Sequence, residues 1–148
     1  MLPVPNAPAG PCVIAHRWAY DPENVQRARD ELRLHLAKWG TPVEVMESAV
    51  LVLSELFTNA LRHARQPEGR HVETRFERRA SGVRIEVHDA GETRPERREV
   101  HPDEECGRGL VLVDALTGGR WGVGERAGVG KMVWAVCGPA HAGVEVSA

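Results

Sequence analysis

The chain has 148 residues, of which 42% are hydrophobic, and this size fits one domain with a hydrophobic core rather than two full domains. Its formal net charge of −2 predicts no general electrostatic attraction to nucleic acid or to an anionic membrane. Three widely spaced cysteines, an odd number, favour reduced thiols in the cytoplasm over a disulfide framework, and no stretch has the roughly 18 apolar residues that span a bilayer.

The first part of the chain predicts a strand and an amphipathic helix. Residues 1–11 are rich in Pro and Ala and lack a basic segment, which indicates a flexible lead-in and not a signal peptide. Residues 12–18 have the composition of an edge strand. A helix is predicted over residues 22–39, with Asp21 as its N-cap, a proline in its first turn and Gly40 at its end.

A second helix is predicted over residues 41–64, because a capping-box pattern opens it and apolar residues recur at helical spacing. Glu55 and Asn59 lie one turn apart on the edge of its apolar face. The Glu55 carboxylate lies close to apolar surface and could act as a general base or hold a water molecule. The amide oxygen of Asn59 is a suitable ligand for a hard cation such as Mg²⁺. A solvated helix edge is the alternative that these two residues alone leave open.

A hairpin and a long loop follow the second helix. Strands are predicted at residues 72–79 and 83–89 with a short turn between them, and the second strand alternates apolar and polar residues. This alternation predicts one buried face and one more polar face. Residues 90–106 contain Gly, Pro and many charges without a hydrophobic period, which indicates a long mobile loop. Loops of this length in a compact domain are usually functional.

A short helix and a second hairpin complete the predicted fold. The helix begins at residues 107–109 (GRG) and is ended by a glycine pair, and strands follow at about residues 120–125 and 131–136. This order favours an α+β fold, a two-layer α/β sandwich in which helices cover one face of a mostly antiparallel mixed sheet. We expect one domain over residues 12–137, followed by a loose tail over residues 138–148.

Two further segments of this layout offer ligand contacts. Asp89 ends a strand and Gly91 follows it, so the carboxylate can accept from an exocyclic amine such as that of adenine, while the glycine permits a close backbone turn. An ordinary strand end with a turn glycine is an equal alternative. Gly107 and Gly109 at a helix entry would offer free backbone N–H groups to phosphate oxygens, with Arg108 as an added positive contact.

Together these segments resemble the GHKL (Bergerat) ATP-binding fold, which is shared by type II topoisomerases, some chaperones, histidine kinases and DNA mismatch-repair ATPases. Residues 55–60 (ELFTNA) resemble its first box, residues 89–91 (DAG) its second, and residues 107–110 (GRGL) its third. Residues 130–134 (GKMVW) match its closing strand. The resemblance implies ATP or ADP, together with Mg²⁺, as cofactors.

The small size and the first helix make the chain similar to the anti-sigma-factor serine/threonine kinases of bacteria. In that family the domain sequesters a sigma factor or phosphorylates a small antagonist protein. The resemblance implies that Glu55 is the catalytic base and that Asn59 holds Mg²⁺. It places His63 and Leu110 among the nucleotide-binding residues, beside those of the second and third boxes. It also suggests a homodimer.

Two functions of different classes follow from the resemblance. The first is an anti-sigma factor with serine/threonine protein kinase activity towards an anti-sigma-factor antagonist. The second is a non-catalytic nucleotide-binding module that sequesters a sigma factor or an antagonist by surface contact. We favour the kinase, because Glu55 stands where a purely structural nucleotide site needs no carboxylate. Either a modest adenine affinity or poor discrimination between ADP and ATP is expected, because three positions differ from the family pattern: Thr93, Lys131 and Met132.

Overall fold

The computed structural model describes residues 12–62, 71–89, 104–125 and 131–139, apart from the side chains of residues 104–108 and 125. Its helices and strands, in chain order, are β1 (Val13–Ala19), α1 (Glu23–Lys38), α2 (Val43–Arg62), β2 (His71–Arg79), β3 (Gly82–Asp89), α3 (Glu104–Thr117), β4 (Trp121–Glu125) and β5 (Lys131–Cys137). The predicted order of strand, two helices, hairpin, helix and hairpin is therefore confirmed.

The five strands form one sheet in the order β1-β2-β3-β5-β4. β2 and β3 pair through the predicted hairpin, whose register runs from Val72 opposite Asp89 to Arg79 opposite Gly82. β4 and β5 form the second predicted hairpin, and β5 also pairs with β3 in the middle of the sheet. Every pairing among the described strands is antiparallel, so this sheet is antiparallel throughout rather than mixed.

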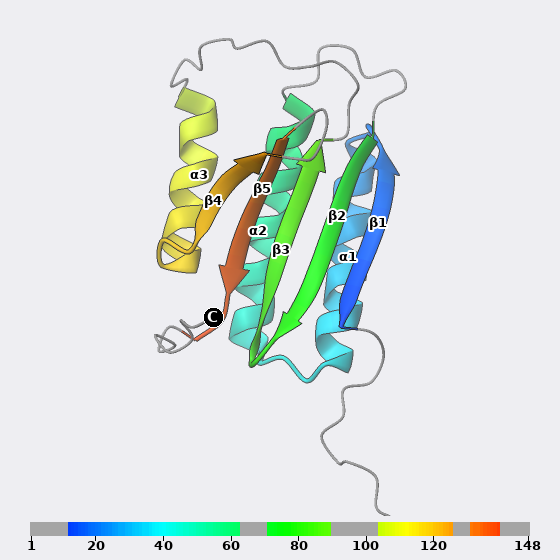
Figure 1. Cartoon of the computed structure of the whole chain (residues 1–148), viewed down its shortest axis with the longest axis vertical. Coiled ribbons are helices and arrows are strands. Elements are labelled where there is room, and N and C mark those ends of the chain that lie inside the picture. The colour runs from blue at the N-terminus through cyan, green and yellow to red at the C-terminus, as the bar shows by residue number, and fades with distance from the viewer. Residues whose placement is uncertain (1–11, 63–70, 90–103, 126–130, 140–148) are drawn as a thin grey trace, which may run out of the picture.

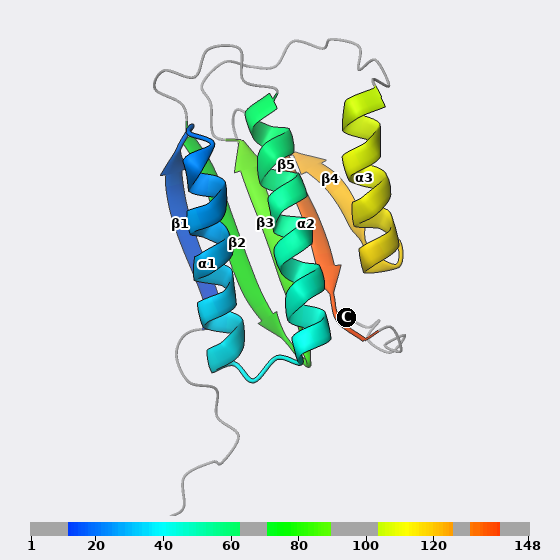
Figure 2. The same ribbon diagram turned by 180° about the vertical axis from the view of Figure 1, so that it is seen from behind.

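The three helices lie on one face of the sheet (Figure 1). Seen from behind in Figure 2, α1 covers β1 and β2, α2 crosses β3 and β5, and α3 lies on the side of β4. α2 contacts both of the other helices, so it is the centre of the helical layer. The predicted two-layer α+β sandwich is confirmed.

The hydrophobic core fills the space between α2 and the middle of the sheet. Val83, Ile85 and Val87 of β3 are buried against the helices, while the residues between them are only partly buried and lie on the other face. The alternation that predicted this strand is thus the alternation of its two faces. α1 contributes every fourth residue to the same core through the small and aliphatic side chains of Ala28, Leu32 and Leu36.

The start of α1 differs in detail from the prediction. Pro22 is the N-cap residue, with φ of −55°, and it has no side chain that could act as a capping acceptor. Asp21 still supplies that acceptor, because its Oδ1 receives the backbone N–H of Glu23 at 2.9 Å. The helix therefore begins at Glu23, one residue later than predicted, although Pro22 already has the φ of a helical residue, which its ring fixes. At the other end, Gly40 has the positive φ of +74° that its predicted role requires.

The start of α3 corrects the prediction more substantially. The helix begins at Glu104 rather than at Gly107, so the glycine pair of residues 107–109 lies inside it. Each interior glycine costs a helix about 1 kcal/mol relative to alanine. The predicted end is confirmed, since Gly118 and Gly119 have φ of +65° and +83°.

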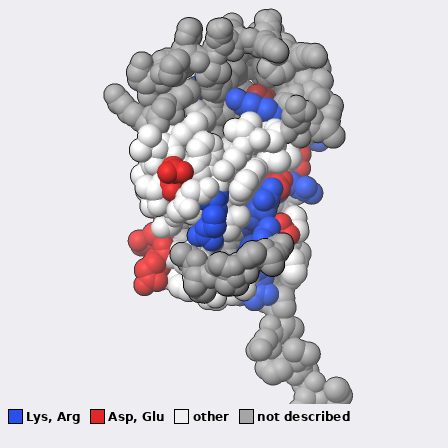
Figure 3. Space-filling view, turned by 60° about the vertical axis from the view of Figure 1, so that its left-hand side comes forward, with Lys and Arg blue, Asp and Glu red and all other residues white. Residues whose placement is uncertain are grey.

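The face of the sheet opposite the helices is open among the described residues and carries charged side chains of both signs. Arg75 and Glu73 of β2 and Arg84 and Glu86 of β3 lie there as close pairs. In the oblique view of Figure 3, basic and acidic side chains lie next to one another on the described surface. None of the described helices is long and apolar enough to cross a membrane.

Candidate functional site

Helix α2 presents Glu55 and Asn59 at the edge of its buried face. Both side chains are only partly buried, whereas their apolar neighbours in the same two turns are fully buried: Leu53, Leu56, Phe57 and Ala60. The predicted position at the rim of the core is therefore confirmed. The chemical roles of the two residues stay predictions.

A small hollow lies between α2 and the ends of β3 and β5. Its walls are apolar and its rim is polar, with lining side chains from Leu56, Asn59, Ala60, Val87, Asp89, Lys131 and Val133. It holds about 10 Å³ of water-accessible space, which is room for about one water molecule. An apolar slot with a few polar groups at one end is the usual form of a site for a flat heterocycle.

Asp89 is the most buried polar group of this hollow, with 8% of its surface exposed. It is the last residue of β3 and lies on the helix side of the sheet, in step with Val87 and Ile85. The Tyr20 hydroxyl donates a hydrogen bond to Asp89 Oδ1 at 2.8 Å. Burying a carboxylate costs free energy unless it is hydrogen-bonded, so the Tyr20 hydroxyl helps to offset the cost of burying Asp89.

Lys131 brings a positive charge to the same rim. It is the first residue of β5 and stands directly opposite Asp89 in the antiparallel register. Side chains of directly opposed residues lie on the same face of a sheet, about 4.5–5.5 Å apart at their β-carbons. The hollow therefore offers an acceptor and a donor next to each other.

Glu55 lies further along α2, against α3. A β-carbon built on Gly109 would come within 2.8 Å of Glu55 Oε1, closer than real side chains approach. Gly109 is therefore the residue that leaves space for the Glu55 carboxylate between the two helices. Glu55 therefore lies beside α3, one helical turn before Asn59, which lines the hollow together with Asp89.

The sequence model of the family described as "Histidine kinase-like ATPase domain" matches residues 18–136, which is most of the chain. The chain belongs to this family. The match extends from the end of β1 to the next-to-last residue of β5, and it confirms the GHKL-type ATPase fold that the sequence motifs predicted. A search of curated proteins gave no match.

Membership of the histidine kinase-like ATPase family implies ATP or ADP as the ligand of this chain. The side chains around the hollow fit the adenine end of such a ligand. Leu56, Ala60, Val87 and Val133 supply apolar walls, and the Asp89 carboxylate supplies an acceptor suited to an exocyclic amine. The amide oxygen of Asn59 is of the kind that Mg²⁺ takes from proteins.

The third predicted motif, residues 107–110, lies inside α3 and not at the entry to the helix as predicted. Because α3 begins at Glu104, the N–H of Gly109 falls within the hydrogen-bonding pattern of the helix and is not a free donor. The free N–H groups belong to the first turn of α3 instead. Leu110 is partly buried in the same helix. His63, Gly91 and the side chain of Arg108 lie outside the described residues.

Two residues of the ATPase site were missed by sequence reasoning. Tyr20 lies between β1 and α1, 69 positions before Asp89, and follows no motif. Its being the sole tyrosine in the sequence gave no indication of its partner. Lys131 was singled out as a difference from the family pattern, but only the pairing of β3 with β5 places it beside Asp89.

Proposed function

We propose that this ATPase domain is a cytoplasmic anti-sigma factor with serine/threonine protein kinase activity towards a small antagonist protein. The observation that carries the proposal is the position of Glu55, a partly buried carboxylate one helical turn from Asn59 and beside α3. A site that bound nucleotide only as a structural ligand would not need a carboxylate there. The resemblance of residues 55–60 to the first box of the anti-sigma-factor kinases supports the same conclusion.

The proposed chemistry assigns separate tasks to the side chains of the site. Bound MgATP supplies the phosphoryl group. The apolar walls of the hollow and Asp89 orient the adenine ring, and the Asn59 oxygen helps to hold Mg²⁺. Glu55 accepts the proton of the acceptor hydroxyl, and the hydroxyl oxygen forms a bond to the γ-phosphorus of ATP while the bond from that phosphorus to the bridging oxygen breaks and ADP leaves.

The proposed partners are a sigma factor and an antagonist protein with a serine or threonine acceptor. The resemblance also supports a homodimer as the working form. A non-catalytic module that sequesters either partner by surface contact is the second candidate. It is favoured by the exposed apolar side chains of Val111 on α3 and Val123 on β4, which are 68% and 62% exposed.

The deciding experiment combines binding with phosphoryl transfer. The purified protein is incubated with γ-labelled ATP, Mg²⁺ and candidate sigma and antagonist proteins, and Mg-ADP affinity is measured by calorimetry. In Glu55→Gln, nucleotide affinity should stay within about threefold, while transfer falls by about 100-fold or more because the base is lost. In Asn59→Ala, affinity for the magnesium nucleotide and transfer should fall together, because a metal ligand is lost.

Each result separates the two candidates. Phosphoryl transfer that continues at the full rate in Glu55→Gln would refute the role of Glu55 as the general base. Partner binding without any transfer in the wild type, and unchanged in Glu55→Gln, would establish the non-catalytic module instead. If the folded protein bound no nucleotide at millimolar concentration with Mg²⁺ present, both candidates would fail.

A further inference from the structure

The rim of the hollow holds two opposite charges that do not neutralise one another in the structure. Asp89 and Lys131 are directly opposed across β3 and β5 and both line the hollow. Directly opposed carboxylate and ammonium groups usually pair. Among the described residues, however, Lys131 takes part in no ion pair.

The neighbours of Asp89 provide a reason for this arrangement. Tyr20 holds Oδ1 of the carboxylate at 2.8 Å from the other side, where β1 ends. Tyr20, just after β1, and Lys131, on β5, therefore approach Asp89 from different segments, and the tyrosine holds the carboxylate independently of the lysine. The hollow presents an acceptor on β3 and a donor on β5.

We propose that Lys131 donates a hydrogen bond to N1 of the adenine ring while Asp89 accepts from the adjacent 6-amino group. N1 and the 6-amino group are neighbours on one edge of adenine, where N1 is an acceptor and the amino group is a donor. Their order matches a carboxylate and an ammonium on neighbouring strands. This inference rests on the nucleotide binding proposed above, and it makes Lys131 a specificity-determining residue.

The size of the hollow also assigns a movement to Lys131. Space for about one water molecule cannot admit a purine, so some lining side chain must move when the base enters. Of the seven lining residues, six have short or branched side chains on packed elements. Lys131 alone has a four-carbon flexible stem. Its ammonium can therefore swing from the hollow to the edge of the base.

The test compares ADP with 1-deaza-ADP, in which a C–H group replaces N1 and cannot accept a hydrogen bond. Affinities of the intact chain are measured by calorimetry with Mg²⁺ present, in the wild type and in Lys131→Met. The wild type should bind ADP about tenfold more tightly than the analogue, as expected for one hydrogen bond from a charged donor. In Lys131→Met, affinity for ADP should fall by a similar factor, and the two nucleotides should bind alike.

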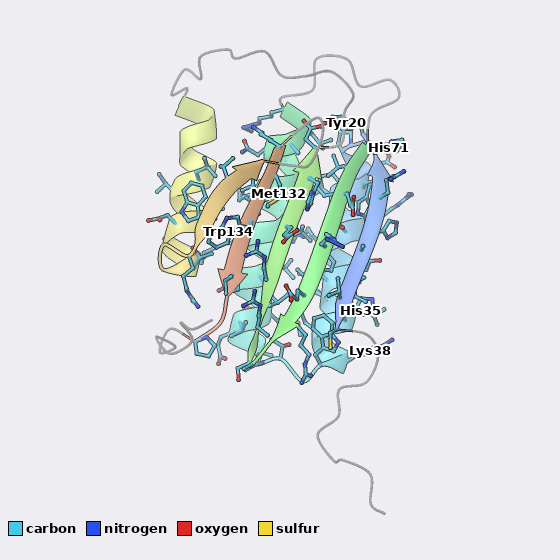
Figure 4. The ribbon with its side chains drawn as sticks, in the orientation of Figure 1. Tyr20, His35, Lys38, His71, Met132 and Trp134 are labelled. Carbon is cyan, nitrogen blue, oxygen red and sulfur yellow. The ribbon has the colours of Figure 1, made fainter. Side chains whose placement is uncertain are left out.

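The chain offers a matched control because Lys38 is its one other lysine. Lys38 is exposed at the end of α1, and Figure 4 shows it at the opposite end of the molecule from Tyr20. Lys38→Met should therefore keep the tenfold preference for ADP. A preference that persists in Lys131→Met would overturn the inference and leave the proposed function intact. Failure of the wild type to bind either nucleotide would instead overturn nucleotide binding itself.

A measurement on the unsubstituted lysines guards against a misfolded variant. Reductive methylation with ¹³C-formaldehyde labels both lysines and the α-amino group, and the NMR signal that is missing from Lys131→Met belongs to Lys131. Saturating ADP should shift the Lys131 signal, whereas 1-deaza-ADP at saturation should shift it much less. Equal shifts with the two nucleotides would contradict a hydrogen bond to N1.

Discussion

The hydrogen bond between Tyr20 and Asp89 predicts a measurable coupling between two distant parts of the chain. In Tyr20→Phe the aromatic ring stays, but the buried carboxylate loses one donor, so the free energy of unfolding should fall by about 1 kcal/mol. ADP affinity should fall by about threefold to tenfold, since Asp89 is less well fixed. Chemical denaturation and calorimetry measure the two effects.

The control for this prediction is a double-mutant cycle with Asp89→Asn. If the hydroxyl acts through the carboxylate, the double variant should lose less stability than the sum of the two single variants, by more than about 0.5 kcal/mol. Strict additivity of the two losses would show that Tyr20 contributes only by packing.

Individual site residues were predictable only where a local pattern marked them. Glu55 and Asn59 were placed at the rim of the core by helical periodicity, and the structure puts them there. Asp89 was marked by its position at a strand end. Tyr20 and Lys131 join the site through the pairing of strands far apart in the sequence, and no periodicity carries that information.

Helix α3 carries the second prediction, through the close approach of Gly109 to Glu55. In Gly109→Ala, the added methyl group would lie 2.8 Å from Glu55 Oε1, so the flexible glutamate side chain must turn away. The helix itself should gain up to about 1 kcal/mol from the better propensity of alanine. We therefore expect a melting temperature that is unchanged or higher, together with a loss of phosphoryl transfer of about tenfold or more.

Val111→Ala is the matched control, because it also introduces alanine into α3 but at a side chain that is 68% exposed. With the partner protein at saturating concentration, it should leave the rate of phosphoryl transfer unchanged. If Gly109→Ala transferred phosphate at the wild-type rate, the position of Glu55 beside α3 would have no part in catalysis.

The elements differ in how well their sequences predict them. β3 was predicted closely, because strict alternation of apolar and polar residues indicates a strand with one buried face. The start of α3 was predicted too late, at residues 107–109, because two glycines close together were interpreted as a phosphate-binding turn at the entry to the helix. Glycine is unfavourable inside a helix, so the glycines at residues 107 and 109 did not indicate a helix that already begins at Glu104.

The two faces of the sheet differ in character, since one packs against the helices and the other carries charged side chains. The helix-covered face holds the core and the hollow, and both depend on packing between α2 and the strands. On the open face, Glu86 accepts hydrogen bonds from Arg84 Nε at 2.9 Å and, at 2.8 Å, from His88 Nε2 when that ring nitrogen carries the proton. Arg75 of β2 and Trp134 of β5 stand opposite Glu86 in the register. Arg84 also lies over the Trp134 ring, 4.9 Å from its centroid.

This cluster makes the stability of the whole domain depend on pH. Partial burial acts to raise the pKa of Glu86, but the hydrogen bonds from His88 and Arg84 outweigh it, and the pKa lies below its usual value of 4.5. A carboxyl group whose pKa is lowered by folding stabilises the folded state at pH values above its unfolded pKa. That contribution is lost as the pH falls through the folded pKa.

Glu86→Gln should therefore lower the free energy of unfolding at neutral pH by about 1 kcal/mol, the usual size for a hydrogen-bonded ion pair near a surface. Below the folded pKa the wild type has lost the same contribution, so the two proteins should become similarly stable in urea titrations at a pH below the folded pKa of Glu86. Glu77→Gln is the control on the same face, since its ion pair with Arg79 is 45% and 43% exposed and long at 3.7 Å. It should change stability little at either pH. A gap between wild type and Glu86→Gln that stayed constant from neutral to acid pH would show that Glu86 stabilises the sheet by packing alone.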